Sequence, residues 1–355
     1  MNARTEPTRT LGGVNRRILT LLVALAPVLA FGLLLGTVTV PYVALGPGPT
    51  FNTLGVGPDG KEVVDIEGTK VYPVTGHLNM TTVAQHDELS IFEALMLWGS
   101  GRDQLVPRDL VYPPDKSREE VDKSNSADFE ASETKAQNAA LGYLKYAPAV
   151  TVQVVSKDGA SDGKLQVGDA IDKVNGTLIT SSGQFQDLLK QTKPGDQVVI
   201  ESRRKEQAEP ATTTITLGKG DDPNRGYLGV AVTYAPWANF KIDFNLANIG
   251  GPSAGLMFAL AVVDKLTDGN LTGSKFIAGT GTIDNKGEVG AIGGITHKML
   301  AAYEAGAAVF LVPADNCAEA RTGNDEGLLL VRVETLEKAV DALHTISAGG
   351  EPPRC

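Results

Sequence analysis

A serine follows a glycine-rich turn and precedes a strongly apolar segment. Residues 248–255 read NIGGPSAG, and the run LMFALAVV follows at residues 256–263. We expect this run to form a helix with Ser253 at its N-terminus, where free backbone N–H groups and the helix dipole favour negative charge. A hydroxyl there suits a nucleophile whose reaction develops an oxyanion. The alternative is that Ser253 only caps the helix, the commoner role of an isolated serine in such a place.

A lysine lies on the apolar face of a second expected helix. Residues 293–306 begin with two glycines, continue with helical spacing and end at a glycine that is typical of a helix C-terminus. Lys298 shares a face with Ile295 and Ala302. Such a lysine either extends its amine into solvent or is buried, and burial lowers a lysine pKa by up to about 3–5 units. Only the buried form is a usable general base near neutral pH.

Short strands must position these two helices. Residues 276–284 and 288–292 are expected to form two strands around a tight turn, and residues 307–312 a buried strand. Residues 62–83 also have strand character, but the sequence does not show whether they complete the same sheet. Residues 113–135 are polar and charged, which fits either a solvated linker or the surface of a helix.

These segments together resemble the proteolytic domain of the Lon family. Residues 251–255 match the family's nucleophile motif, residues 290–298 (GAIGGITHK) match its lysine motif, and Thr280 matches a threonine beside the dyad. The resemblance covers about residues 226–342. It implies a serine endopeptidase with a serine–lysine dyad.

The same resemblance implies a role for each matching residue. Ser253 would be the nucleophile, Lys298 the general base and then acid, and Thr280 the group that orients the lysine amine. Backbone N–H groups of the nucleophile loop would form the oxyanion hole, with Gly251, Ser253 and Ala254 as its residues. No metal and no cofactor are implied.

The sequence also departs from the family's pattern. Gly250 and Thr282 stand where many Lon enzymes have acidic residues, and no GxxxxGK[S/T] phosphate loop occurs in the sequence. We therefore expect a peptidase that works without ATP. His297 is the alternative base, but it lies about 100° around the helix from Lys298, so both cannot face Ser253.

Residues 150–217 resemble a PDZ domain of the bacterial protease type. The resemblance lies in residues 164–171 (KLQVGDAI), 174–176 (VNG) and 193–196 (KPGD). It implies a groove beside a helix that accepts an extended peptide by strand addition.

Two features bear on that groove. Phe185, Leu188 and Leu189 share one face of the expected helix and are its candidate peptide-binding residues, with core packing as the alternative. Residues 140–143 (ALGY) loosely resemble a peptide-carboxylate loop, with the end of an alanine-rich helix as the alternative.

The N-terminal region predicts a membrane segment. Residues 18–40 are a run of 23 almost wholly apolar residues, and no charged residue occurs from 18 to 58. About 20 such residues cross a bilayer. Four arginines and one acid precede the run, which predicts a cytoplasmic N-terminus and a single-pass anchor with the remaining chain outside the cell membrane. A cleaved signal peptide, giving a secreted protein, is the alternative, but its apolar region is shorter, at about 7–15 residues.

Composition excludes several other classes. The chain of 355 residues has 32 basic and 42 acidic side chains, a net charge of −10, which argues against nucleic-acid binding. Four scattered histidines show no metal-ligand spacing. Cys317 and Cys355 are the only cysteines. They are a candidate disulfide, because the compartment predicted for them is oxidising; a buried free Cys317 and a free or intermolecular Cys355 are the alternatives.

The sequence thus predicts an α+β multidomain protein with a transmembrane helix, a PDZ domain built as a small β-barrel or sandwich with helices, and a Lon-type α/β proteolytic domain. The order resembles the PDZ-containing, YlbL-like membrane-anchored proteases of bacteria. Its partners would be protein or peptide substrates and the cell membrane, without ATP or nucleic acid, and a homo-oligomer is left open. The alternative function is a tethered peptide-binding scaffold with a non-catalytic peptidase-like domain.

The expected limits of the segments along the chain are 1–17 cytoplasmic N-terminus, 18–40 transmembrane helix, 41–145 strand and helix region with a polar linker, 146–219 PDZ domain, 226–345 proteolytic domain and 346–355 tail.

Overall fold

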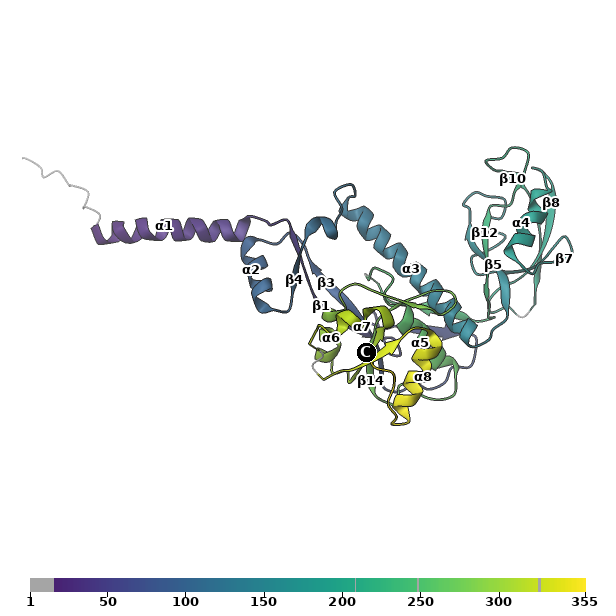
Figure 1. The fold of residues 1–355 in the computed structure, drawn as a ribbon. Coiled ribbons are helices and arrows are strands. Elements are labelled where there is room, and N and C mark those ends of the chain that lie inside the picture. The colour runs from purple at the N-terminus through teal and green to yellow at the C-terminus, as the bar shows by residue number, and fades with distance from the viewer. Residues whose placement is uncertain (1–15, 208, 248, 325–326) are drawn as a thin grey trace, which may run out of the picture. The chain divides into compact units, whose positions relative to one another are not determined.

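The computed structural model describes residues 16–207, 209–247, 249–324 and 327–355 (Figure 1). The predictions on Arg4 and Arg9, on the rest of the N-terminus before residue 16, and on Asn248 lie outside these residues. The α+β multidomain class is confirmed: the described residues contain one apolar N-terminal helix, a mainly parallel sheet covered by helices, and a separate antiparallel sheet with one helix beside it. The chain divides into two compact units, one with residues up to 46 and 84–114, the other with residues 47–83 and 115–355.

The first unit contains the apolar helix α1 (Arg16–Thr37), of which residues 18–37 are long and apolar enough to cross a membrane. The segment after α1 enters β1 (Tyr42–Asn52), whose first residues pair antiparallel with β4 (Gln104–Pro107). Between them lies the short helix α2 (Ile91–Ser100), and the 3-10 helix η1 (Arg108–Leu110) follows β4.

The second unit contains a mainly parallel sheet that runs in the order β18, β17, β14, β3 and β1. Its strands β3, β14, β17 and β18 are His77–His86, Phe276–Gly279, Val309–Pro313 and Leu329–Val333. Because β3 pairs in parallel with β14, part of the stretch at residues 62–83 does complete the proteolytic sheet. Two small antiparallel pairs join β2 (Val64–Glu67) to β13 (Lys241–Phe244) and β15 (Thr282–Ile283) to β16 (Val289–Gly290).

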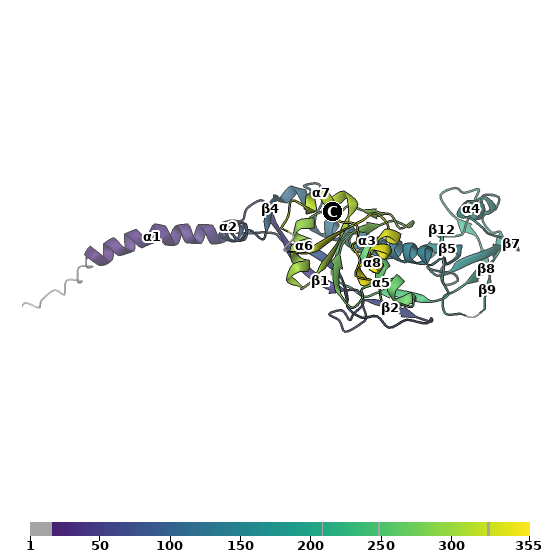
Figure 2. The same ribbon diagram turned by 60° about the horizontal axis from the view of Figure 1, so that its bottom comes forward.

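Helices cover both faces of this sheet, as alternate residues of its strands show. Ile277 and Leu311 belong to a core shared with α3, α5 and α8, whereas Ala278 and Phe310 belong to a core shared with α6 and α7 (Figure 2). Residues 255–265 of α5 are all buried, which explains why that helix has no polar face. The bounds of the helices are Arg118–Tyr143 for α3, Gly255–Leu266 for α5, Ile295–Glu304 for α6, Cys317–Ala320 for α7 and Leu336–Ser347 for α8, and the 3-10 helix η2 is Ala314–Asn316.

The polar stretch at residues 113–135 proves to be mostly helix α3, not a linker. Ser117 caps the helix and forms a capping box with Glu120. A narrow stripe faces the core, where Phe129 meets Phe258 of α5 edge to face, with ring centroids 5.7 Å apart. The remaining faces of α3 are polar, which is why its composition resembles that of a linker.

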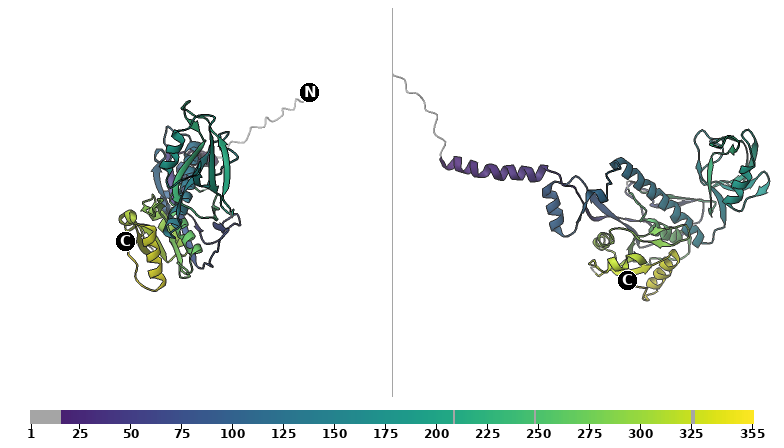
Figure 3. Two further views of the ribbon diagram at one scale, coloured as in Figure 1. Left: turned by 90° about the vertical axis from the view of Figure 1, so that its right-hand side faces the viewer. Right: turned by 45° about the horizontal axis from the view of Figure 1, so that its top comes forward.

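The PDZ strands form a sheet of their own in the order β12, β5, β6, β8 and β9, with β7 beside β6 (teal and green in Figure 3). Strand β12 lies beyond the predicted PDZ limits of 146–219 and inside the range predicted for the proteolytic domain, yet it pairs along its length with β5. The bounds are Pro148–Val155 for β5, Ala170–Val174 for β6, Thr177–Leu178 for β7, Ser182–Lys190 for α4, Gln197–Arg203 for β8, Ala211–Thr216 for β9, Gly218–Lys219 for β10, Gly226–Tyr227 for β11 and Val230–Pro236 for β12.

The C-terminal tail is tied to the proteolytic sheet. A disulfide joins Cys317 and Cys355, which are 38 positions apart. The backbone N–H of Cys355 also donates to the carbonyl of Leu330, 3.1 Å away, and that of Arg332 donates to Pro353 at 3.0 Å. The tail thus extends the edge at β18 and is held there covalently.

Removing this cross-link is expected to destabilise the domain. Closing a loop of this length is worth about 3–4 kcal/mol in the chain-entropy model, so a Cys317→Ala/Cys355→Ala variant should lose about 2–4 kcal/mol of unfolding free energy in urea titrations. Wild type with a reductant should move to the same midpoint. Identical midpoints for oxidised wild type and the variant would show that the bridge adds no stability.

Candidate active site

The loop before Ser253 is held by helix α3. Gly251 has a positive φ of 85°, and its N–H donates to the carbonyl oxygen of Asn125 at 2.8 Å. The hydroxyl of Ser132 donates to the carbonyl oxygen of Pro252 at 3.0 Å. A Cβ on Gly250 would lie 2.8 Å from the Cβ of Asn125, so the acidic side chain expected at that position from the Lon pattern would not fit against α3.

Ser253 does not cap the helix that follows it. Helix α5 begins at Gly255, its N-cap is Ala254, and the cap makes no side-chain hydrogen bond. The carbonyl oxygen of Ser253 accepts hydrogen bonds from the N–H of Gly281 at 2.9 Å and from the hydroxyl of Thr280 at 3.1 Å. The backbone of Ser253 is therefore fixed, while its hydroxyl is left for another partner.

That partner is the amine of Lys298. Its Nζ lies 2.8 Å from Ser253 Oγ and 3.0 Å from Thr280 Oγ1. The lysine comes from the face of α6 that also buries Ile295 and Ala302, and only 3% of it is exposed. The side chain of Lys298 is therefore buried, and its amine does not extend into solvent.

Burial changes the acidity of this amine. Loss of solvent disfavours the charged form and lowers the pKa of Lys298 to about 8. Among the described residues no carboxylate forms an ion pair with Lys298, and the hydroxyl groups of Ser253 and Thr280 are both neutral. With this pKa about a tenth of the amine is uncharged at pH 7, and this form can take a proton from Ser253 Oγ.

Thr280 is fully buried and links the two groups, because its hydroxyl accepts from Lys298 and donates to the backbone of Ser253. Thr280→Val keeps the shape and removes this link. Loss of one such hydrogen bond, worth about 1–2 kcal/mol, should lower kcat/KM about 5–30-fold.

Thr81 is the matched control for this substitution, because it is also buried and its hydroxyl donates to the carbonyl of Gly279 and not to a group of the dyad. Steady-state kinetics of Thr280→Val and Thr81→Val, compared at equal folded fraction, test the role. Equal losses in both variants would reduce Thr280 to a packing residue.

Two of the three predicted oxyanion-loop residues keep a free backbone donor. Within the described residues, the N–H groups of Ser253 and Ala254 meet no acceptor. The N–H of Gly251 is already bonded to Asn125, so it is not available to an oxyanion in this conformation. His297 is 8% exposed, its Nε2 has no partner among the described residues, and it makes no hydrogen bond to Ser253. The geometry therefore favours Lys298 over His297 as the base.

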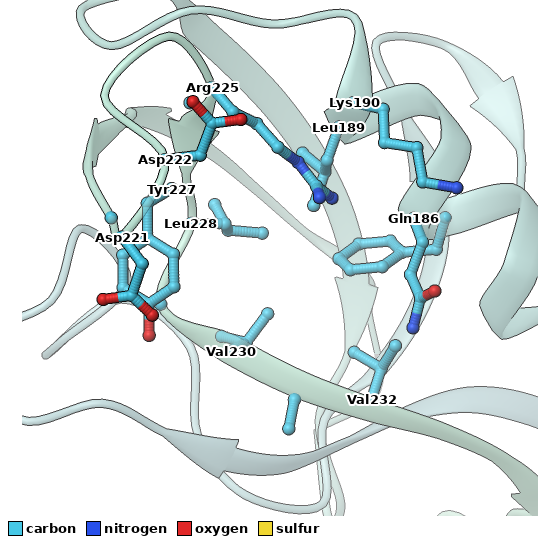
Figure 4. Close-up of a pocket in the computed structure, with 15 residues that line it drawn as sticks. Gln186, Leu189, Lys190, Asp221, Asp222, Arg225, Tyr227, Leu228, Val230 and Val232 are labelled. Carbon is cyan, nitrogen blue, oxygen red and sulfur yellow. The ribbon is translucent and has the colours of Figure 1, made fainter.

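A second candidate site is a cavity of about 580 Å³ in the PDZ domain, between α4 and β12 (Figure 4). Phe185 and Leu189 line it and also belong to the buried PDZ core, whereas Leu188 does not line it and packs partly buried against that core. Residues 140–143 are helical in α3, so the carboxylate-loop interpretation of that stretch is wrong.

Sequence reasoning missed the loop at the end of this cavity. Residues 227–230 (YLGV) line it, Gly229 has a positive φ of 79°, and the N–H groups of Leu228 and Gly229 meet no acceptor within the described residues. Arg225 is directed into the cavity from the same segment (Figure 4). The sequence feature that could have indicated this loop is Gly229, which lies between two apolar residues directly before a strand in which apolar and polar residues alternate.

Comparisons with known proteins agree with this division. A model of the Lon protease (S16) C-terminal proteolytic domain matches residues 248–343, and a PDZ domain model matches residues 124–215. A Lon protease of Clostridioides difficile is 46% identical over 65 residues, or 18% of this chain and 8% of that protein. A Lon protease of Phenylobacterium zucineum is 38% identical over 104 residues, or 29% of this chain and 12% of that protein.

The chain therefore spans only about a tenth of the length of these relatives. Among solved structures, the PDZ domain of an SdrC-like protein from Listeria monocytogenes is 26% identical and covers 24% of this chain and 86% of its own, with a TM-score of 0.22. The corresponding domain from Listeria innocua is 28% identical, with coverage of 24% and 92% and a TM-score of 0.22. The two family models show that this chain combines a PDZ domain with a proteolytic domain of the Lon S16 type.

Proposed function

We propose that the protein is an ATP-independent, membrane-anchored serine endopeptidase that cleaves unfolded or flexible protein segments with a Ser253–Lys298 dyad. The observation that carries the proposal is the buried amine of Lys298, 2.8 Å from Ser253 Oγ and without an ion-pair partner among the described residues. A lysine buried only for packing has no reason to direct its amine at a serine that ends a glycine-rich turn.

The contacts support a two-stage hydrolysis. Neutral Lys298 takes the proton of Ser253 Oγ as the oxygen attacks the carbonyl carbon of the substrate peptide bond. The N–H groups of Ser253 and Ala254 would stabilise the oxyanion that forms. Lys298 then gives its proton to the leaving amine, which leaves an ester on Ser253. Lys298 next deprotonates a water molecule that attacks this ester, and the proton returns to Ser253 Oγ as the acid product leaves.

The apolar helix α1 supports placement at the cell membrane. Its residues 18–37 are long enough to cross a bilayer, and no other residue that the structure describes buries any part of that stretch. With the arginines on the cytoplasmic side, both the PDZ and proteolytic domains would be outside the membrane, as in the YlbL-like proteases that the segment order resembles. No phosphate loop occurs in the sequence, so substrates are expected to arrive already unfolded.

The PDZ cavity supports the binding of extended peptides with a free C-terminus. A peptide strand placed between α4 and β12 could extend the sheet, with its carboxylate near the N–H groups of Leu228 and Gly229. Gln186→Trp, on the α4 side of the cavity (Figure 4), should fill it and weaken binding about tenfold or more, which is about 1.4 kcal/mol.

The control for this prediction is Asp187→Trp, because Asp187 lies on the same helix but does not line the cavity. Fluorescence polarisation with a library of peptides that have randomised last residues and free carboxylates measures the difference. Equal affinity of the two tryptophan variants, or equal binding of C-terminally amidated peptides, would contradict this assignment.

The competing function is a tethered PDZ scaffold whose peptidase-like domain does not cleave. Incubation of an unstructured protein with wild type or Ser253→Ala, without ATP, followed by mass spectrometry of the products, separates the two. We expect defined new peptide termini with wild type and none with Ser253→Ala. An intact substrate with both proteins would favour the scaffold.

A further inference from the structure

Helix α2 presents an apolar face that no described residue of its own unit covers. Phe92, Leu95, Met96 and Trp98 are 54%, 54%, 61% and 66% exposed. Phe92, Leu95 and Met96 are spaced three and four residues apart and so share one face, which Trp98 widens. Four large apolar side chains on a ten-residue helix are more than the scattered exposed residues that ordinary surfaces carry.

The opposite side of α2 already has its own packing. Ala94 is buried with Ala44 and Leu89, and Leu97 packs partly buried against the same cluster. The exposed face is therefore a second apolar face of α2, in addition to the one that packs in this cluster. A capping box satisfies the backbone N–H groups of Ser90 and Glu93 at the N-terminus of α2.

The start of α2 is fixed to the end of α1 by backbone hydrogen bonds. Val38 donates to Leu34 in the last turn of α1, and the N–H of Ile91 donates to the carbonyl of Val38 at 3.1 Å. The N–H of Val40 donates to the carbonyl of Leu89 at 2.9 Å. Figure 1 shows α2 beside the C-terminal end of α1, and the two helices are in contact.

This connection determines where α2 lies if α1 spans a bilayer. Residues 18–37 extend about 30 Å at 1.5 Å per residue, the thickness of the hydrocarbon core. Thr37 and the first turn of α2 then lie at the outer boundary of that core. At this depth, tryptophan and other large apolar side chains are favoured, because the ring is partly in hydrocarbon and partly beside polar headgroups.

We propose that the apolar face of α2 is inserted into the outer leaflet of the membrane as a second anchor beside α1. The proposal rests on the proposed membrane location of α1, but not on the peptidase activity. With α1 as the only membrane contact, the rest of its unit would be free to rotate about the axis of α1. A second, off-axis contact of Phe92, Leu95, Met96 and Trp98 with lipid removes that freedom and fixes which side of the unit faces the membrane.

The chain offers a direct probe, because Trp98 and Trp237 are its only tryptophans. Trp237 is 8% exposed in the PDZ domain, where its Nε1 donates to Gly168. The full chain is reconstituted into phosphatidylcholine vesicles whose acyl chains carry bromine either near the headgroups or near the bilayer centre. Subtracting the emission of Trp98→Phe from that of wild type isolates Trp98.

We expect Trp98 to lose most of its emission, and to lose more with bromine near the headgroups than with bromine at the bilayer centre. The residual emission of Trp98→Phe, from Trp237, should be the same in brominated and plain vesicles. If the chain floats with the vesicles in a density gradient but Trp98 is not quenched, α1 is an anchor and the α2 proposal is wrong. The same result is expected if a second copy of the chain, and not lipid, covers the apolar face of α2. If the chain does not float with them, the membrane location and the α2 proposal both fail, while the peptidase proposal is untouched.

Discussion

Lys298→Met is expected to abolish cleavage while making the folded protein more stable at pH 7. Activity should fall by at least about 10⁴-fold, the scale seen when a nucleophile loses its base. The free energy of unfolding should rise, because the wild type buries an amine that burial disfavours, and methionine fills the same volume without that cost. Ser253→Ala should lose as much activity, and the double variant no more than either, since the two groups act as one unit.

Lys265 is a matched control for Lys298. It is also 3% exposed, but its amine donates to Glu62 and to the carbonyl of Val64, away from the dyad. Lys265→Met should lower stability and leave kcat/KM of the folded fraction nearly unchanged. Urea titration and peptide-cleavage kinetics measure both quantities. Substantial activity in Lys298→Met would show that another group, with His297 first in line, takes the proton.

The rate of cleavage is expected to rise steeply from acidic to alkaline pH along a single titration. The mechanism needs Lys298 uncharged, and burial lowers its pKa to about 8. The uncharged fraction then rises from about 1% at pH 6 to about 90% at pH 9, so kcat/KM should rise roughly 90-fold and level off above pH 9. The free energy of unfolding should also increase as the pH rises above about 8. The reason is that the lysine keeps its proton up to a higher pH in the unfolded chain than in the folded one.

Single-turnover cleavage over this pH range, with a substrate that has no titrating groups, measures the profile. The residual activity of Lys298→Met should lack the step, whereas Lys265→Met should keep it at the same pH. A profile that stays flat from pH 6 to pH 9 with chemistry as the slow step would contradict a lysine base.

The parts of the site that depend on local sequence could be predicted. The turn at residues 250–253 and the helix face with Ile295, Lys298 and Ala302 are set by nearest neighbours, and each lies where the sequence places it. What the sequence could not decide was burial of the lysine, because whether a face is covered depends on elements that are distant in the chain. The structure covers it, leaving 3% of Lys298 exposed.

The parts that depend on long-range pairing were missed or left open. Helix α3 is mostly polar, so its few core contacts and its hydrogen bonds to Gly251 and Pro252 have no signal in composition. Strand β12 follows the PDZ motifs by many residues, yet it pairs with β5, the first strand of that sheet. Pairing between chain segments is set by the whole fold, and alternation of apolar residues shows only that a strand exists.

Covalent labelling tests most directly whether Ser253 is a nucleophile activated by Lys298. The protein is incubated at pH 9 with a peptidyl fluorophosphonate, and the modified residue is located by mass spectrometry of its peptides. We expect a single adduct on Ser253, formed at a rate that falls with pH as the uncharged fraction of Lys298 falls, and nearly lost in Lys298→Met but retained in Lys265→Met. An adduct on another residue, or labelling of Ser253 at the same rate in Lys298→Met, would contradict the dyad.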